Sequence, residues 1–293
     1  MKKMWILAGV FISATVLLLF FRTATSKQTN LITKTMNYEQ RNLPNSIVHI
    51  LRVPAHSQFI VTPALSSQLN TVEEVAKKHQ AVAIINAGFF DPVNQKTTSI
   101  VFQQGKLTGN PKDNQRLVDN PDLKPYLNKI LNRTEFRRYL CEQTIRYSIT
   151  LHSEPPAGGC QLVDAVGGGP QLLPELTSVQ EGFVDNANKR DALGSTKPNA
   201  RSAIGIISDG SIVLVMVAQK PNTPGNSGMS LPELAHFMKT LGVEKAMNLD
   251  GGSSSSLYYD GKTFYGKVDS KGNLVKRPVK SVLIIQETLS EVK

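Results

Sequence analysis

The apolar positions of this chain form one long unbroken run, followed by many short ones. The long run covers residues 4–21, follows Lys2 and Lys3, and ends before Arg22. It is about long enough to cross a bilayer as a helix, and it lacks the polar face of a helix packed on a soluble core. We therefore expect an N-terminal transmembrane helix within residues 1–25, followed by a polar tether in residues 26–45.

A cleaved signal peptide is the alternative for this segment. The apolar run is longer than a usual signal core, and only Ala24 with Ser26 offers a weak cleavage site, so we favour an uncleaved anchor. Lys2 and Lys3 place the N-terminus inside by the positive-inside rule. The domain is then expected outside the cytoplasmic membrane, anchored to it, or secreted or periplasmic if the segment is removed.

Short apolar runs bounded by turn residues predict many β-strands after position 45. They lie at residues 46–54, 58–65, 81–90, 145–152, 160–173, 199–219 and 281–287. Asp209-Gly210 divides one of these runs, and Asp260-Gly261 follows another apolar stretch; both dipeptides predict hairpin turns. The last run should tie the C-terminus into a sheet.

Two capping boxes predict helices between the strands. Thr71 with Glu74 begins one helix, and Ser230 with Glu233 begins a second helix that stops at Gly242. Residues 103–140 are polar and irregular, and we interpret them as an insertion over the core with a helix in residues 125–140. The predicted fold is α+β: a single domain, residues 46–293, with a mixed, mostly antiparallel β-sheet core and a few packed helices.

Composition fits this interpretation without naming a function. Of 293 residues, 40% are apolar and 19% charged, which is ordinary for a globular domain. The formal net charge is +10, but no RNA or DNA motif accompanies it, so we expect no nucleic-acid partner. A basic surface outside a membrane suits anionic lipids, anionic glycans or phosphorylated substrates, and a merely solvated basic surface is the alternative.

The chain has two cysteines, Cys141 and Cys160. In an exported protein they are expected to pair as a disulfide, and two unpaired buried thiols are the alternative. Closing a loop of this size would stabilise the fold by roughly 3 kcal/mol in the chain-entropy model.

The candidate functional residues lie where the apolar runs end. The segments NAGFFDP, GGGP, NARS and NLDGGSSSS each follow or precede such a run. Glycine permits close backbone approach, arginine can grip a phosphate, and aspartate can act as base or nucleophile. Each segment taken alone could have a purely structural role. Gly168 and Asp250 are typical of turns, Arg201 of an ion pair and Phe89 of a core position.

Several enzyme classes lack their motifs here. The serines form no G-x-S-x-G elbow, and there is neither a Walker loop nor a dinucleotide fingerprint with its acidic residue. The histidines are scattered without zinc-ligand spacing, so no zinc site is implied; they are His49, His56, His79, His152 and His236.

Taken in order, the blocks NAGFF, AVGGGPQLL, RSAIGI and GMSLPELAHFMKTLGVEKAMNLDGGSSSSLYY resemble the phosphodiester glycosidase family. That family is typified by the lysosomal uncovering enzyme, which removes N-acetylglucosamine from a phosphodiester cap on mannose, and many bacterial members are labelled exopolysaccharide-related. The resemblance covers about residues 84–286. The chain departs from the family pattern in reading NAG after the strand, a serine after DGG, and Ser202 after the arginine.

The resemblance implies a set of site residues. It places Asn86, Asp250 and Arg201 in catalysis, and the substrate-binding positions at Gly88, Phe89, Gly168, Gly169, Gly251, Gly252, Ser253 and Ser254. Asp250 is the expected carboxylate near the anomeric carbon, and Asp91 is a second candidate unless Asp91-Pro92 is only a turn. A divalent cation held by Asp250 is the candidate cofactor, since hard cations favour oxygen ligands, and the sequence leaves the metal requirement open.

The predicted function is hydrolysis of a sugar-1-phosphodiester of the N-acetylglucosamine type, on envelope or exopolysaccharide-related substrates. A phosphate monoester is a good leaving group, so such a site needs less general acid help than an ordinary glycosidase. It needs hydrogen-bond donors around the departing phosphate. The alternatives are a non-catalytic glycan-binding or assembly factor for envelope polysaccharide, and a serine esterase.

Overall fold

The computed structural model describes residues 34–288 of the chain. The predicted transmembrane helix and the first part of the tether lie outside the described residues. Within residues 34–288, no helix has both the length and the apolar character needed to cross a membrane.

Sheet 1 is the largest of the three main sheets. Its strands are β1 (Asn37–Asn42), β2 (Ile47–Val53), β10 (Gln171–Leu173), β13 (Arg201–Ile207), β14 (Ile212–Ala218) and β15 (Val243–Asn248). They lie in the order β1-β2-β14-β13-β15-β10. The predicted hairpin turns at Asp209-Gly210, where β13 pairs antiparallel with β14, and this prediction is confirmed.

Sheet 2 contains the chain's C-terminal strand. It comprises β3 (Phe59–Asn70), β4 (Ala83–Asn86), β16 (Ser256–Tyr259), β17 (Lys262–Tyr265) and β18 (Val279–Glu287), in the order β17-β16-β4-β18-β3. The turn at Asp260-Gly261 joins β16 to β17, as predicted. Strand β18 pairs with β3 and β4 on its two sides, so the C-terminal run is tied into the sheet as expected.

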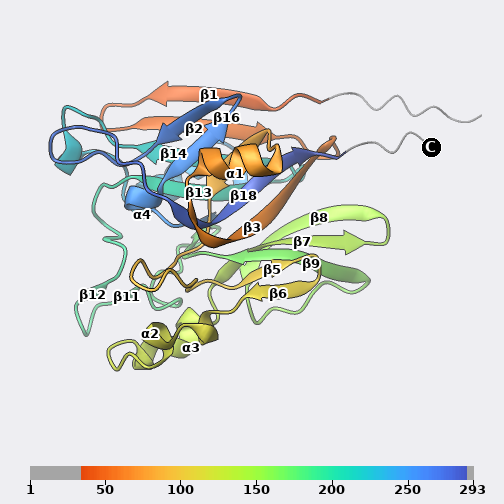
Figure 1. The fold of residues 1–293 in the computed structure, drawn as a ribbon, viewed down its shortest axis with the longest axis horizontal. Coiled ribbons are helices and arrows are strands. Elements are labelled where there is room, and N and C mark those ends of the chain that lie inside the picture. The colour runs from red at the N-terminus through yellow and green to blue at the C-terminus, as the bar shows by residue number, and fades with distance from the viewer. Residues whose placement is uncertain (1–33, 289–293) are drawn as a thin grey trace, which may run out of the picture. The chain divides into compact units, whose positions relative to one another are not determined.

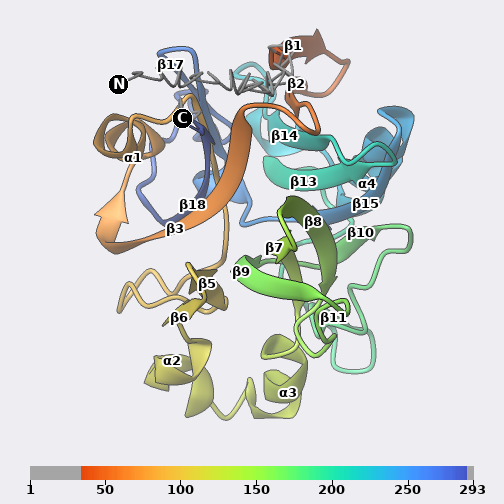
Figure 2. The same cartoon turned by 90° about the vertical axis from the view of Figure 1, so that its right-hand side faces the viewer.

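Sheet 3 lies beside these two and is built from the middle of the chain (Figures 1 and 2). Its strands are β5 (Val101–Gln103), β6 (Lys106–Gly109), β7 (Thr134–Cys141), β8 (Thr144–Leu151) and β9 (Cys160–Gly167), in the order β6-β5-β9-β7-β8. A two-stranded ribbon, β11 (Val184–Asp185) with β12 (Arg190–Asp191), follows. All recorded strand pairs of residues 34–288 are antiparallel, so the sheets are less mixed than predicted.

Both capping boxes are present where the sequence predicts them. Helix α1 (Val72–His79) begins at Thr71 and α4 (Leu231–Thr240) at Ser230, each with its reciprocal glutamate bond. The remaining helices are short: α2 (Gln115–Val118), α3 (Leu127–Ile130), and the 3₁₀ turns η1 (Pro111–Asp113), η2 (Lys124–Tyr126), η3 (Pro224–Asn226) and η4 (Gly252–Ser254).

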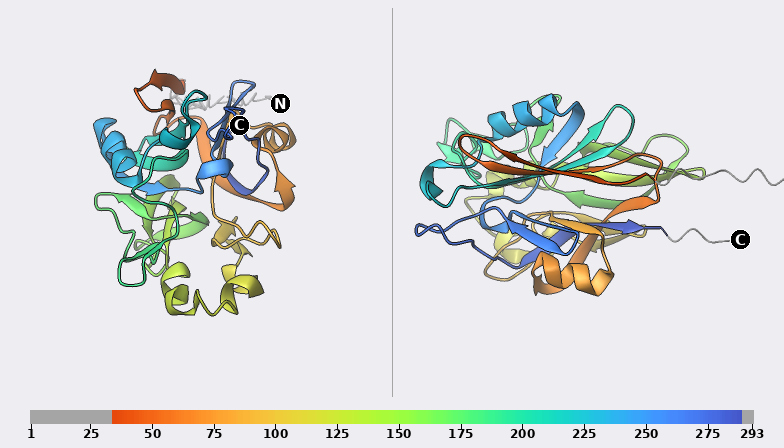
Figure 3. Two further views of the ribbon diagram at one scale, coloured as in Figure 1. Left: turned by 90° about the vertical axis from the view of Figure 1, so that its left-hand side faces the viewer. Right: turned by 90° about the horizontal axis from the view of Figure 1, so that it is seen from above.

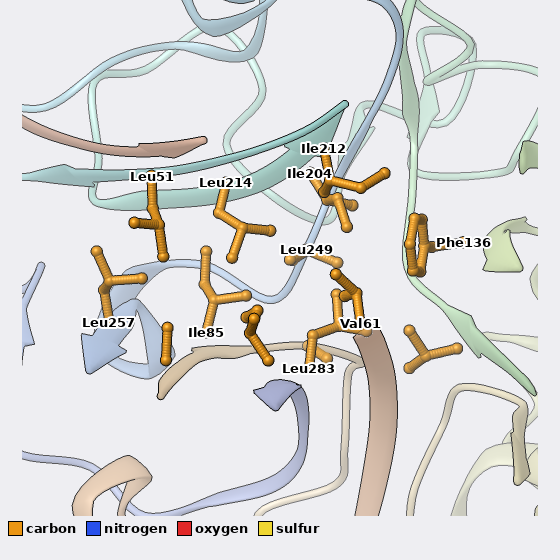
Figure 4. Packing of buried hydrophobic residues seen from close by; sticks show 14 of the residues in the cluster. Leu51, Val61, Ile85, Phe136, Ile204, Ile212, Leu214, Leu249, Leu257 and Leu283 are labelled. Atoms are coloured by element: carbon orange, nitrogen blue, oxygen red, sulfur yellow. The ribbon is translucent and has the colours of Figure 1, made fainter. Parts of the chain in front are cut away.

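Sheets 1 and 2 pack face to face as a sandwich with one helix on each outer face. The orange helix α1 and the blue helix α4 lie on opposite sides in the view from above (Figure 3). The inner cluster joins Leu214 of sheet 1 to Ile85 and Leu283 of sheet 2, and Phe136 of sheet 3 closes it at one side (Figure 4). Separate apolar clusters bury α4 on sheet 1 and α1 on sheet 2.

Two predictions about chain organisation were wrong. Residues 37–42 of the predicted tether form β1, which pairs along its whole length with β2. Residues 134–140 of the predicted insertion and helix form β7, while only Leu127–Ile130 is helical. In β7, Phe136 is buried in the inner cluster and the backbone pairs with β8 and β9, and these interactions outweigh the helical spacing of the apolar residues.

The predicted disulfide is confirmed. Cys141 and Cys160 face each other across β7 and β9, their Cα atoms are 4.1 Å apart, and their sulfurs are bonded. The bridge staples two neighbouring strands of sheet 3 at the end of β7 remote from Thr134.

Candidate active site

The segment that begins with Asp250 leaves the end of β15 and turns sharply into η4. The Asp250 N–H donates to the Ala87 carbonyl at 2.8 Å, and the Asn86 amide donates to the Asp250 carbonyl at 2.6 Å. Both backbone groups of Asp250 are therefore fixed by the end of β4. This arrangement brings a strand of sheet 2 to the end of a strand of sheet 1.

Asn86 is the hub of this junction. It is fully buried, and its side-chain oxygen accepts hydrogen bonds from the Ser202 hydroxyl at 2.7 Å and from the Ser256 N–H at 3.0 Å. Its polar groups thus bind β13, β16 and the Asp250 turn at once. These bonds position the three segments around the fully buried Asn86, and its predicted role in catalysis stays a prediction.

The Asp250 carboxyl group has an unusual environment. Burial raises its pKa to about 6, while the Ser254 hydroxyl, the charge of Arg277 and the Gly251 N–H act in the opposite direction. The residue is nevertheless partly exposed, so solvent or a ligand can reach it. A carboxyl group with this pKa can accept a proton near neutral pH.

The glycines of the turn allow its tight path. Gly252 has φ 60°, which is left-handed, and its N–H donates to the Ala200 carbonyl at 2.8 Å. A Cβ on Gly251 would lie 3.2 Å from the same carbonyl. These two positions therefore hold the turn against the start of β13, in agreement with a glycine requirement here.

The serines after the glycines have different surroundings. Ser253 is partly exposed, and its hydroxyl accepts a hydrogen bond from Arg277 at 2.8 Å. Ser254 is buried with its hydroxyl beside the Asp250 carboxyl. Of these two predicted binding serines, Ser253 is thus partly exposed and Ser254 is buried, and their predicted roles in substrate binding stay predictions.

Arg201 lies against the Asp250 turn, where a Cβ on Gly251 would be 3.8 Å from its Cδ, but its guanidinium donates to backbone. Its side chain is 2% exposed and donates to the carbonyls of residues 193, 194, 197 and 229 at 2.8–3.1 Å. Burial lowers its pKa to about 10. Arg201 thus anchors the segment before β13 to the residue that precedes the N-cap of α4, and its predicted contact with a phosphate stays a prediction.

The GGGP segment reaches the site through its backbone. The Gly169 N–H donates to the Asn248 carbonyl at 2.8 Å, and the Asn248 amide returns a bond to the Gly169 carbonyl at 2.9 Å. A Cβ on Gly168 would lie 2.8 Å from the Asn248 carbonyl, and one on Gly169 2.4 Å from a carboxylate oxygen of Glu181. Both glycines thus permit close packing beside the Asp250 turn.

The NAGFF segment lies on the opposite side of the same junction. A Cβ on Gly88 would lie 2.9 Å from the Gly167 carbonyl, so the glycine lets sheets 2 and 3 approach. The partly exposed Phe89 ring is 5.7 Å from Phe183, and the Arg133 guanidinium lies 3.7 Å over Phe183. Phe183 is 1% exposed beneath Arg133, so Phe89 is the ring of this pair that a ligand can reach.

Asp91, the second candidate carboxylate, lies in a separate surface turn. Its carboxylate accepts the Val93 N–H and pairs with Arg116 at 2.8 Å. Burial opposes ionisation, but these partners outweigh it and keep the Asp91 pKa below its usual value. The contacts indicate a turn-forming residue, which was the structural alternative for Asp91-Pro92.

Sequence reasoning missed Arg277, Phe183 and Asn248. Arg277 and Phe183 lie in irregular segments without periodicity, so only their three-dimensional neighbours single them out. Asn248 stands two positions before Asp250, and its proximity to that residue was the one available signal.

No group of three or more histidine, cysteine, aspartate or glutamate side chains within residues 34–288 is arranged to hold a metal ion. A cation held by Asp250 would have to draw most of its ligands from serine and carbonyl oxygens. A divalent cation remains a prediction of the sequence alone.

A large cavity among the described residues lies away from this site. It has a volume of about 820 Å³ and is lined by Val53, Tyr147, Asp209 and Lys245 among others, at the end of β13 remote from Arg201. The Asp250 turn does not contribute to it.

The comparisons with known proteins decide the family. The model of the phosphodiester glycosidase family matches residues 79–286, which include every site residue described above. The chain belongs to the phosphodiester glycosidase family. It is accordingly a hydrolase of phosphodiester-linked sugars.

Solved structures of the same fold are distant in sequence. The catalytic domain of zebrafish N-acetylglucosamine-1-phosphodiester alpha-N-acetylglucosaminidase, auto-inhibited by its pro-peptide, is 20% identical, with a TM-score of 0.67 over 90% of this chain and 86% of its own. A hypothetical protein from Synechocystis is 18% identical, with a TM-score of 0.56 over 85% and 62%. A putative exported protein from Burkholderia pseudomallei is 18% identical, with a TM-score of 0.52 over 82% and 74%. No curated protein matches the sequence significantly.

Proposed function

We propose that this phosphodiester glycosidase hydrolyses an N-acetylglucosamine-1-phosphodiester, releasing the free sugar and a phosphate monoester. The family membership supports the bond that is cleaved, and the name of the zebrafish relative supports the sugar. Asp250 is partly exposed as a residue, and burial raises the pKa of its carboxyl group to about 6; this observation carries the proposal. The reaction needs a carboxylate that can accept a proton or attack the anomeric carbon, and Asp250 is the candidate for that group.

The bond changes assign a task to each group. The C1–O bond breaks with its electron pair going to the phosphate oxygen, and a water oxygen forms the new bond to C1. Asp250 acts as the base that takes the water proton, or first as a nucleophile at C1 that water then displaces. The departing phosphate monoester is a weak base, so hydrogen-bond donors are enough to stabilise it.

The remaining parts of the site support binding. The partly exposed Phe89 ring and Arg133 side chain offer contacts for a sugar, and the partly exposed Ser253 lies in the Asp250 turn, three residues after the aspartate. Burial lowers the Arg133 pKa to about 9, so this cation keeps its charge at neutral pH.

We also propose that the domain works outside the cytoplasmic membrane on envelope or exopolysaccharide-related substrates. The apolar run of residues 4–21 supports a membrane anchor, and the disulfide between Cys141 and Cys160 supports an oxidising compartment. A cleaved N-terminus would make the protein secreted or periplasmic. Fractionation of expressing cells, with and without protease added outside, distinguishes these locations.

The test of the activity is free-sugar release. The full chain in mild detergent is offered UDP-N-acetylglucosamine and a panel of synthetic sugar-1-phosphodiesters, with and without EDTA. Asp250→Asn is expected to lower kcat by about 10³-fold, as removal of a positioned base or nucleophile does, while Asp91→Asn leaves it within a few-fold. The anomer first released, read by NMR, separates the base role from the nucleophile role.

Three other outcomes would favour a different function or add a cofactor. If the folded chain releases no sugar from any of these compounds, the glycan-binding alternative gains. Covalent labelling of a serine by a fluorophosphonate probe would instead favour an esterase. Loss of release in EDTA, restored by Mg²⁺ or Ca²⁺, would establish the divalent cation.

A further inference from the structure

Arg277 lies in the segment between β17 and β18 and reaches the Asp250 turn from the side of sheet 2. One of its terminal nitrogens donates to the Ser253 hydroxyl at 2.8 Å, and its guanidinium lies 4.8 Å over the ring of Phe90. The residue is partly exposed, while Phe90 beneath it is buried. The ring and the serine thus fix the guanidinium at the mouth of the site.

Most donors of this guanidinium remain available. The side chain can donate five hydrogen bonds, and one bond, to Ser253, is recorded for it in the described part of the chain. Arg277 also forms no salt bridge with a carboxylate of residues 34–288. Arg201, in contrast, uses its donors on four carbonyls.

We propose that Arg277 binds the phosphate of the substrate and thereby selects phosphodiesters over neutral glycosides. This inference rests on the proposed function and assigns to Arg277 the phosphate contact that the sequence predicts for Arg201. A planar guanidinium can hold two phosphate oxygens at once, and its fixed position means that little side-chain freedom is lost on binding. Ser253 serves as the second contact at the same turn.

Lys267 is the competing cation near the turn. Its ammonium group donates to the Asn199 side chain at 3.1 Å, and burial lowers its pKa. A lysine held by a neighbouring amide and partly desolvated is a weaker phosphate ligand than a free guanidinium fork. Lys267→Met therefore serves as the rival variant in the experiment.

The first measurement is binding of methyl phosphate to the full chain in mild detergent, by calorimetry at pH 7. Arg277→Met is expected to raise Kd by about 10- to 100-fold, the effect of losing a charged hydrogen-bond partner, and Arg277→Lys to raise it less. Lys276→Met is the matched control, because it removes an exposed charge from the adjacent residue, and it should change Kd less than two-fold.

The second measurement compares two leaving groups. For a sugar-1-phosphodiester, kcat/KM should fall 10- to 100-fold in Arg277→Met, whereas for the 4-nitrophenyl glycoside of the same sugar it should stay within a few-fold. A merely structural role would lower both rates together. Circular dichroism checks folding. If the methionine variant does not fold, the same comparison of leaving groups is made with Arg277→Lys, which keeps the charge and most of the packing.

The outcomes separate this inference from the proposed function. Methyl phosphate binding that depends on Arg277, with no sugar released by the parent chain, would refute the hydrolysis proposal and support the phosphate site. Release by the parent chain with unchanged methyl phosphate binding in both Arg277 variants would overturn the phosphate site alone. Loss of binding in Lys267→Met but not in Arg277→Met would also overturn it, as would no binding of methyl phosphate by the parent chain.

Discussion

Replacing Asp250 with asparagine should make the folded protein more stable at neutral pH while abolishing its activity. Burial raises the Asp250 pKa from 3.8 to about 6. The folded state therefore prefers the protonated carboxyl group, and its contribution to stability is full below pH 3.8 and is lost as the pH rises through about 6. Asparagine has the shape of the protonated form and carries no charge to desolvate.

The size of the effect follows from these two pKa values. The interval from 3.8 to about 6 corresponds to about 3 kcal/mol, at about 1.4 kcal/mol per pKa unit. For a domain of this size, that free energy raises Tm by about 6–12 °C. The Asp250→Asn variant should therefore exceed the parent in Tm by this amount at pH 8, with the difference shrinking below pH 6 and vanishing near pH 4.

The assay is thermal or urea unfolding of both proteins at several pH values from 4 to 8. Asp91→Asn is the control of opposite sign: the Asp91 pKa is lowered by its partners, so its ionised form stabilises the fold above pH 3.8 and that contribution is lost as the pH falls. An Asp250→Asn variant that is no more stable than the parent at pH 8 would refute the reasoning. It would indicate a turn-forming aspartate instead of a buried functional carboxylate.

Two further predictions concern residues outside the reacting centre. Arg201→Met should lower the free energy of unfolding by on the order of 3 kcal/mol, because it removes four hydrogen bonds to backbone carbonyls. Differential scanning calorimetry measures the effect, and a soluble variant with an unchanged Tm would contradict the prediction. The double variant Cys141→Ser, Cys160→Ser should lower the free energy of unfolding, measured in urea, by about 3 kcal/mol. It should leave kcat within a few-fold, since the disulfide lies at the end of β7 remote from Thr134. A large loss of kcat in the folded variant would contradict this expectation.

Local sequence signals predicted those elements whose determinants are close together in the chain. The capping boxes at Thr71 and Ser230 begin helices because each cap satisfies N–H groups three residues away. The dipeptides at Asp209 and Asp260 turn hairpins for a similar reason, since the second residue of each is a glycine at positive φ.

Strand β7 shows where such signals fail. Its residues read as the second half of a helix, yet their hydrogen-bond partners are β8 and β9, which come later in the chain. The tether prediction failed at β1 in the same way, because its polar residues gain backbone pairing with β2 that no local pattern reports. Strand pairing is non-local, so propensity alone decides it poorly.

The site divides along the same line. The sequence by itself determined the Asp250 turn, because a carboxylate, two glycines and serines must be contiguous to form it, and it determined the disulfide partners because the chain has only two cysteines. Tertiary structure alone decided which arginine presents its guanidinium at that turn. Arg201 and Arg277 carry the same charge, but one is enclosed by carbonyls and the other stands partly exposed beside Ser253. Burial and hydrogen-bond satisfaction, which depend on distant segments, set the difference.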